Sequence, residues 1–178
     1  MKENMKTHTE TIVLGGGCFW CMEAVFSLLQ GVISLTPGYA GGATENPTYD
    51  DVCSGTTNHA EVVKIEYDQE KLPLSKVLSI FFSSHDPTTA NRQGNDIGTE
   101  YRSIILFTAP HQKKEIEEAI KEIQKKYAKP IVTEVKKLDC FYPAEEEHHR
   151  YFEKNPEQVY CRLVISPKVE KVKRLMIA

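Results

Sequence analysis

The chain has 178 residues, of which 40% are hydrophobic and 26% charged, and this composition suits one soluble domain with a buried core. A formal net charge of −3 gives no electrostatic reason to expect nucleic acid as a partner. No apolar run approaches the roughly 20 residues that span a membrane, and the polar N-terminus lacks the apolar stretch of a secretory signal. We therefore expect a cytoplasmic protein whose five cysteines are thiols.

The predicted elements alternate between strands and helices, with two long loops among them. In chain order they are a strand at 11–16, a helix at 18–29, a strand at 32–35, a loop at 36–59, a strand at 61–67, a helix at 74–84, a loop at 85–100, a strand at 101–107, helix 111–127, strand 131–138, helix 144–152 and a strand or extended segment at 159–165. Loops of this length are uncommon and are often functional.

This pattern predicts a single catalytic domain over residues 1–178, with a polar N-terminal arm at 1–10 and a basic C-terminal tail at 167–178. The fold class that suits it is α+β, a two-layer sandwich in which helices cover a mixed or mostly antiparallel sheet. A doubly wound parallel sheet is the competing fold.

The most informative segment is residues 15–21, which read Gly-Gly-Gly-Cys-Phe-Trp-Cys. An apolar strand precedes the glycines and a helical stretch follows them, so Cys18 is predicted at the first turn of a helix. Free backbone N–H groups and the helix dipole favour a thiolate at such a position. The bland alternative is a buried cysteine in a tight turn.

Cys18 and Cys21 also form a Cys-x-x-Cys pair. Such a pair suggests a thioredoxin-like disulfide site or half of a zinc site. Zinc would need two further ligands, and no second Cys-x-x-Cys or His-x-x-x-His motif occurs. The side chains available in principle are Cys140, His148, His149 and Cys161.

A tyrosine and an acidic residue lie near the end of each long loop. Tyr49 and Glu61 belong to the first loop, and Asp96 and Tyr101 belong to the second. Taken singly, such residues more often anchor loops and form turns. Their combination with Cys18 is what gives them functional interest.

Five motifs follow one another along the chain. They are GCFW after a strand, GYAGG, NPTYDDVCSGTTNHAEVVKIEYD, FFSSHDPTTANRQGNDIGTEYRS and FYPAEEEHH. Together they resemble the A-type peptide methionine sulfoxide reductases over about residues 11–167. The resemblance implies a sandwich of ferredoxin-like type and no metal, flavin or nucleotide cofactor.

The resemblance also implies catalytic roles. Cys18 corresponds to the nucleophile, which attacks the sulfur of the S epimer of methionine sulfoxide. Glu61, Tyr49 and Tyr101 correspond to the groups that give protons or hydrogen bonds to the departing oxygen. These residue types fit the task, because a buried carboxyl has a raised pKa and a tyrosine hydroxyl donates without ionising.

Three further residues are implied in substrate binding. Phe19 and Trp20 correspond to the apolar walls around the S-methyl group, and Asp96 to a residue that helps to hold the substrate. Ordinary core packing is the alternative for the two aromatic residues, and turn formation is the alternative for Asp96.

Attack leaves Cys18 as a sulfenic acid, which a second thiol converts to a disulfide. The resemblance favours Cys161 as this resolving cysteine. Cys21, which stands where most of the family has glycine, is the second candidate, and a relay through both is open. Thioredoxin or another external dithiol would then reduce the disulfide.

The remaining predictions concern partners and unassigned residues. Oxidised proteins or peptides are the expected substrates, and the chain is expected to be a monomer. Cys53 and Cys140 are interpreted as structural, and His148 has no assigned chemical step. Two other classes stay open: a thioredoxin-like disulfide oxidoreductase that uses Cys18 and Cys21, and a non-catalytic module that recognises methionine or its sulfoxide.

Overall fold

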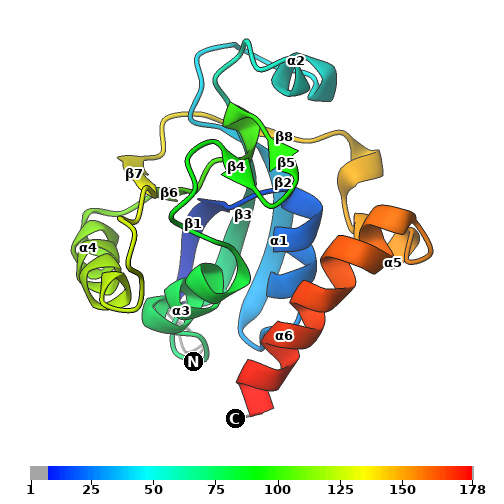
Figure 1. Ribbon diagram of the computed structural model, residues 1–178. Coiled ribbons are helices and arrows are strands. Elements are labelled where there is room, and N and C mark those ends of the chain that lie inside the picture. Colours follow the sequence, from blue (N-terminus) through cyan, green and yellow to red (C-terminus); the bar gives the residue numbers. More distant parts are fainter. Residues whose placement is uncertain (1–7, 178) are drawn as a thin grey trace, which may run out of the picture.

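A computed structural model describes residues 8–177 of the protein (Figure 1). Its strands are β1 (Thr9–Gly15), β2 (Val32–Ala40), β3 (Ala60–Asp68), β4 (Arg92–Gln93), β5 (Asp96–Ile97), β6 (Ile104–Phe107), β7 (Glu134–Lys137) and β8 (Phe141–Pro143). Its α-helices are α1 (Phe19–Phe26), α2 (Tyr49–Cys53), α3 (Leu74–Ser84), α4 (Pro110–Gln124), α5 (Tyr151–Lys154) and α6 (Ser166–Ile177). Two 3-10 turns, η1 (Thr99–Tyr101) and η2 (Glu146–His148), and a π-helical turn, η3 (Cys161–Ile165), complete the described elements. None of the described helices is long and apolar enough to cross a membrane.

Six strands form one mixed sheet in the order β7-β6-β1-β3-β2-β8. All neighbours in it are antiparallel except β6 and β7, which are parallel. The α+β class and the mixed sheet are therefore confirmed, and the doubly wound parallel alternative is wrong. The short strands β4 and β5 pair separately as a hairpin.

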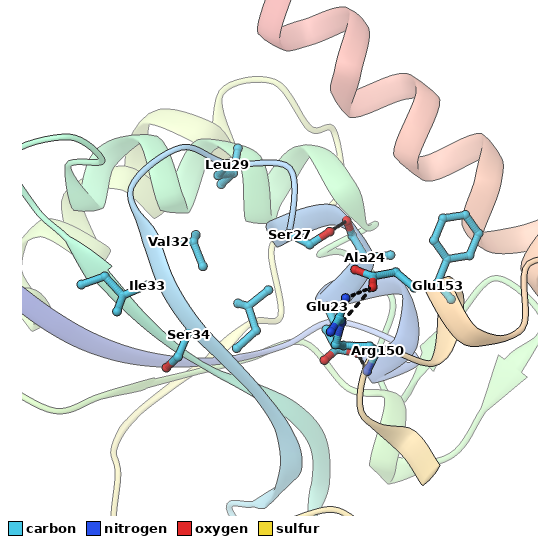
Figure 2. Close-up of a pocket in the computed structure, with 11 residues that line it drawn as sticks. Glu23, Ala24, Ser27, Leu29, Val32, Ile33, Ser34, Arg150 and Glu153 are labelled. Atoms are coloured by element: carbon cyan, nitrogen blue, oxygen red, sulfur yellow. Dashed lines mark hydrogen bonds and ion pairs between the residues drawn. The ribbon is translucent and has the colours of Figure 1, made fainter. Parts of the chain in front are cut away.

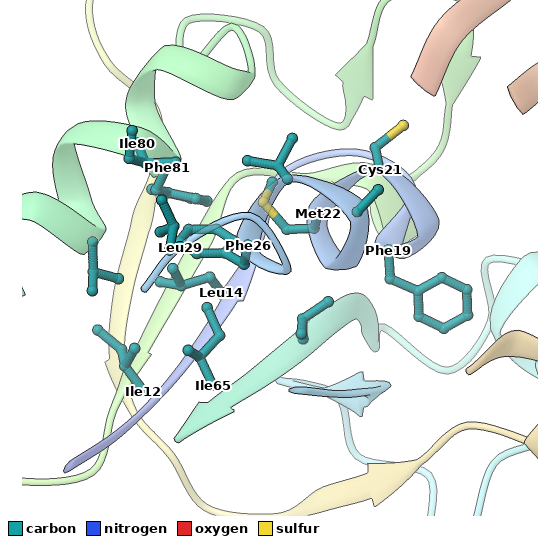
Figure 3. Close-up of a cluster of buried hydrophobic side chains, with 14 of the residues drawn as sticks. Ile12, Leu14, Phe19, Cys21, Met22, Phe26, Leu29, Ile65, Ile80 and Phe81 are labelled. Atoms are coloured by element: carbon teal, nitrogen blue, oxygen red, sulfur yellow. The ribbon is translucent and has the colours of Figure 1, made fainter. Parts of the chain in front are cut away.

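The two faces of the sheet are covered differently. Successive side chains of a strand point to opposite faces, so Ile12 and Leu14 of β1 join a large core on one face while Val13 joins a small cluster on the other. The long helices α1, α3, α4 and α6 lie over the face with the large core (Figure 1). Figure 3 shows Phe26 and Met22 of α1 packed toward Leu14 and Ile65 of the sheet.

The same alternation places Glu61 on the helix-covered face. Val63, Ile65 and Tyr67 belong to the large core, whereas Val62 belongs to the small cluster. Glu61 is an even number of residues from Val63, Ile65 and Tyr67, so its side chain points to the same face of the sheet, toward α1. This position is the link between the fold and the candidate site.

The C-terminal region differs most from the sequence predictions. The strand or extended segment predicted at 159–165 is wrong, because these residues are helical and η3 runs directly into α6, which contains the basic tail as far as Ile177. The buried side chains there are Cys161, Ile165, Val169 and Val172. Their spacings of four, four and three residues are helical, and a prediction based on 159–165 alone misses that period.

Other boundaries also shift. The predicted helix at 144–152 is a 3-10 turn and a short helix, interrupted at Arg150, whose φ of 54° is left-handed. The predicted loop at 36–59 contains the second half of β2 and helix α2. The predicted arm at 1–10 overlaps β1, which begins at Thr9; residues 1–7 lie outside the described part of the chain.

Candidate active site

The glycine turn before α1 is tightly enclosed. A Cβ atom on Gly15 would lie 2.8 Å from the backbone oxygen of Glu61, and one on Gly16 would lie 2.9 Å from the ring of His85. Gly17 adopts a φ of 87°, which a side chain disfavours. The turn therefore holds Cys18 at the N-cap of α1, directly between the end of β1 and the helix.

Cys18 is buried, with 6% of its surface exposed. Burial raises the pKa of its thiol well above the usual value, and hydrogen bonding to Cys21 and the charge of Glu61 raise it further. The backbone N–H of Trp20 acts in the opposite direction, as a helix N-terminus should. Burial outweighs this effect, so the expected preference for a thiolate is not met and Cys18 rests as a thiol.

Glu61 lies beside the first turn of α1. Its Oε2 accepts a hydrogen bond from the backbone N–H of Phe19 at 3.0 Å. Burial raises the pKa of the carboxyl to about 8, although the bond from Phe19 lowers it, and the nearby charges of Glu100 and Asp96 raise it further. Glu61 therefore carries a proton at neutral pH, as the sequence interpretation required.

Three tyrosines surround this carboxyl group. Tyr49 and Tyr101 both have pKa values raised first by burial and then by the charge of Glu61, so their hydroxyl groups stay protonated. Tyr39 pairs in register with Glu61 on the neighbouring strand and donates a hydrogen bond to Glu145 Oε2 at 3.0 Å. The sequence analysis did not select Tyr39, although it lies within the GYAGG motif.

Phe19 and Trp20 differ in their surroundings. Phe19 is 1% exposed, and its ring centroid lies 5.8 Å from that of Tyr39 and 5.4 Å from that of His148. Trp20 is half-buried and stacks on Tyr151, with centroids 3.7 Å apart and planes 7° apart. Phe19 is therefore also a core residue, whereas Trp20 is a partly exposed residue whose tightest ring contact is with Tyr151.

His148 completes the aromatic cluster. Its Nδ1 accepts a hydrogen bond from the indole N–H of Trp20 at 3.2 Å, and its ring lies 4.4 Å from that of Tyr49. Burial lowers its pKa. Because Nδ1 is the acceptor, the neutral ring carries its proton on Nε2, which has no hydrogen-bond partner among the described residues.

Asp96 is connected to the C-terminal region. It accepts a hydrogen bond from the hydroxyl group of Tyr160 at 2.6 Å, and that hydroxyl lies 3.9 Å from the sulfur of Cys21. Tyr160 was not selected from the sequence, because residue 160 was assigned to a strand. Its position follows from the helical path of this segment.

The three buried cysteines have different thiol environments. The neighbouring Cys18 thiol, the charge of Lys168 and the Tyr160 hydroxyl lower the pKa of the Cys21 thiol to about 7, against the effect of burial. Cys161 is fully buried in the same core cluster, and burial raises its pKa, followed by the charge of Cys21. Cys21 is therefore the readiest of the three to ionise.

The other two cysteines are exposed free thiols. Cys53 is the last residue of α2. Burial raises the pKa of its thiol, although the Tyr49 hydroxyl lowers it in part.

Within residues 8–177, no group of three or more His, Cys, Asp and Glu side chains is arranged to hold a metal ion. Cys18 and Cys21 thus have no further pair of ligands there with which to form a zinc site.

A buried thiol, a carboxyl group with a raised pKa and tyrosine hydroxyls thus meet at the N-terminus of α1. The family model of peptide methionine sulfoxide reductase matches residues 10–178. The chain belongs to this family. The predicted family and the predicted type of enzyme, an oxidoreductase that reduces methionine sulfoxide, are confirmed, and the thioredoxin-like and non-catalytic alternatives are not favoured.

Similar proteins span nearly the whole chain. The peptide methionine sulfoxide reductase MsrA of Saccharolobus solfataricus is 55% identical over 93% of this chain and 94% of its own length. That of Leptospira borgpetersenii is 52% identical over 91% and 92%, respectively.

Solved structures agree with the fold. Reduced Mxr1 from Saccharomyces cerevisiae has a TM-score of 0.82 at 34% identity, covering 86% of this chain and 89% of that one. Methionine sulfoxide reductase A of Corynebacterium diphtheriae has a TM-score of 0.82 at 38% identity, covering 86% and 78%. Mxr1 in complex with Trx2 has a TM-score of 0.59 at 24% identity, covering 85% and 89%.

Proposed function

We propose that this protein reduces the S epimer of methionine sulfoxide, in peptides and as the free amino acid, with Cys18 as the nucleophile. The observation that supports this most is the buried Cys18 thiol beside a Glu61 carboxyl group whose pKa is raised to about 8. A nucleophile and a proton donor are the two groups that removal of oxygen from a sulfoxide requires.

The proposed reaction balances without a cofactor. The sulfur of Cys18 attacks the sulfoxide and takes its oxygen, so the substrate becomes methionine and Cys18 becomes a sulfenic acid. Glu61 gives its proton to the oxygen and takes up the proton of the thiol. Tyr49 and Tyr101 donate hydrogen bonds to the same oxygen, and Phe19 and Trp20 enclose the S-methyl group, while Asp96 helps to hold the rest of the substrate.

The contacts support a resolving order different from the one the family resemblance favoured. Cys21 lies one helical turn from Cys18, to whose carbonyl its backbone N–H donates at 3.1 Å, and its thiol has the lower pKa, about 7. We therefore propose that Cys21 attacks the Cys18 sulfenic acid and releases water. Cys161, packed in the same core cluster as Cys21, then displaces Cys18 from this disulfide, leaving a Cys21–Cys161 disulfide and a restored Cys18 thiol.

A dithiol protein such as thioredoxin is the proposed final reductant, with no bound metal, flavin or nucleotide. Support comes from the yeast relative Mxr1, of which a complex with Trx2 has been solved. The thiol chemistry suits the reducing cytoplasm. The proposed working form is the monomer.

A ferredoxin-like sandwich is the proposed finer description of the fold. The order β6-β1-β3-β2 of the four central strands supports it, with α1 between β1 and β2 and α3 between β3 and β6.

The first test concerns the nucleophile. Wild-type protein with dithiothreitol should consume only the S epimer of a blocked methionine sulfoxide, and Cys18→Ser should consume neither epimer. Chromatographic separation of the epimers measures both. Cys140→Ser, at an exposed thiol away from the site, is the control and should keep full activity; activity in Cys18→Ser would refute the proposal.

The second test concerns the relay. One equivalent of sulfoxide should produce one equivalent of methionine in both Cys21→Ser and Cys161→Ser. Cys21→Ser should accumulate the Cys18 sulfenic acid, which a dimedone probe labels, whereas Cys161→Ser should stop at a Cys18–Cys21 disulfide. Mass spectrometry of the peptides distinguishes these outcomes, and a Cys18–Cys161 disulfide in the wild-type protein would favour direct resolution by Cys161.

A further inference from the structure

A buried carboxylate on α1 faces the segment 144–151, which we call the strap. Glu23 is only 5% exposed, and burial raises its pKa. Its Oε2 accepts a hydrogen bond from the backbone N–H of Arg150 at 2.8 Å, which lowers the pKa of the carboxyl group against the effect of burial. Figure 2 shows Glu23 and Arg150 facing each other at the wall of a cavity.

The contact is made with the backbone of Arg150 and not with its side chain. Arg150 is the N-cap of α5 and has a left-handed backbone, with φ 54° and ψ 37°. Its guanidinium group turns outward and pairs with Glu153. Glu23 therefore accepts from the N–H group of the N-cap residue of α5, which has no partner within the helix.

Apolar packing supplies only part of the contact between this segment and the rest of the protein. No residue of α5 is fully buried, although Tyr151 and Phe152 pack partly against the core. A cavity of about 280 Å³ lies between α5, α1 and the start of β2, and its wall includes Glu23 and Phe152. The end of the strap contacts α1 through Glu23 and through the stack of Tyr151 on Trp20, while Glu145 binds its beginning to Tyr39.

The strap supplies two partners of the indole ring, the one that stacks on it and the one that accepts its N–H. Tyr151 stacks on Trp20 at 3.7 Å, and His148 accepts the indole N–H at 3.2 Å. The carboxylate of Glu23 binds the backbone at Arg150, the residue directly before Tyr151. A short path of contacts thus runs from Glu23 through Arg150 and Tyr151 to Trp20.

We propose that Glu23 is a positioning residue: it fastens the strap to α1 and thereby fixes the orientation of Trp20 in the wall of the substrate site. The inference rests on the proposed role of Trp20 as a wall for the S-methyl group. Removing the carboxylate leaves the partly buried N–H group of Arg150 without its acceptor, which favours release of the strap. The adjoining cavity gives the strap room to shift.

The tryptophan content of the chain makes a direct test possible, because Trp20 is the only tryptophan. Glu23→Ala should change the emission of Trp20 and increase its quenching by acrylamide. Glu23→Gln, which keeps a carbonyl acceptor, should restore most of the wild-type spectrum. Glu153→Ala is the matched control: it removes an exposed carboxylate that contacts only the Arg150 side chain, and should leave the spectrum unchanged.

Single-turnover kinetics provide the second measurement. The sulfoxide concentration at half-saturation should rise roughly tenfold in Glu23→Ala, about 1.4 kcal/mol of lost binding, with a smaller change in the maximal rate constant. A wild-type spectrum in Glu23→Ala would overturn the proposal. A changed spectrum with unchanged half-saturation would support the positioning of Trp20 and instead refute its role as a substrate wall.

A double-mutant cycle covers the case in which Glu23→Ala does not fold. Glu23→Gln and Tyr151→Leu act on the same path, so their combined effect on Trp20 quenching should be smaller than the sum of the single effects. Strictly additive effects would contradict the proposal.

Discussion

At the residue scale, burial decides the protonation state of the two central groups. The sequence motif places Cys18 at a helix N-terminus, where a lowered thiol pKa is expected. The thiol is instead enclosed with Glu61, and its pKa rises. The same burial raises the pKa of Glu61 to about 8, which makes this carboxyl group a proton donor at neutral pH.

Glu61→Gln should therefore change both the rate of reduction and its pH dependence. In the wild-type protein, the single-turnover rate constant should fall as the pH rises through about 8, because Glu61 then loses its proton. Glu61→Gln cannot donate a proton, so its rate constant should be lower by ~10²–10⁴-fold and should lack this transition. Rapid-quench measurements between about pH 6 and 9 test this. The same pH dependence of the rate constant in Glu61→Gln as in the wild-type protein would contradict the prediction.

Stability should respond to the same group. The pKa of Glu61 is 4.5 in its ordinary state and about 8 when folded, so the folded protein retains a proton that the unfolded chain releases between these values. The free energy of unfolding should therefore decrease as the pH rises from 4.5 to about 8. Glu61→Gln should remove this part of the pH dependence in urea denaturation.

At the scale of elements, the C-terminal helix is the main difference between the sequence predictions and the structure. Interpreted alone, residues 159–165 are β-branched and apolar enough to predict a strand. The helix depends on Val169 and Val172 further along, which continue the buried stripe that begins at Cys161. This helix brings Tyr160 and Cys161 to α1, so the proposed recycling site depends on it.

Val172→Ala tests whether this packing holds the helix in place. Val172 is fully buried, and its truncation should lower the free energy of unfolding by about 1–3 kcal/mol. Leu175→Ala, on the same helix but 44% exposed, should change it by less than about 0.5 kcal/mol. Urea denaturation measures both, and equal effects would mean that the helix does not pack on the core as described.

At the scale of the whole molecule, the sheet order brings separate loops to one end. Arg102 joins three of them: it donates to the backbone oxygens of Thr99 at 2.8 Å and Asn58 at 3.0 Å, and it pairs with Glu134 at 3.1 Å. Arg102 thereby connects the η1 turn, which contains Tyr101, to the residues just before β3. Glu61 is the second residue of that strand.

Arg102→Leu should weaken the whole arrangement. Arg102 is only 5% exposed, and its replacement removes its hydrogen bonds to partly buried acceptors, so the free energy of unfolding should fall by about 1.5–3 kcal/mol. Lys125→Ala, which removes an exposed ion pair with Glu122, should change it by no more than about 1 kcal/mol. Thermal and urea unfolding of the two variants provide the comparison; similar losses would contradict the bridging role of Arg102.

The sequence by itself determined the features that depend on local pattern. Glycines before Cys18, alternation in β3 and the apolar helix at 74–84 each lie within a few residues of chain, and the motifs indicated the family. Only the tertiary structure decided the raised pKa of Cys18, the position of Cys161 and the contact between Glu23 and Arg150. These features arise from residues up to 139 positions apart, such as Cys21 and Tyr160. Their energies depend on burial and on which groups meet after folding, and no local period in the chain encodes either.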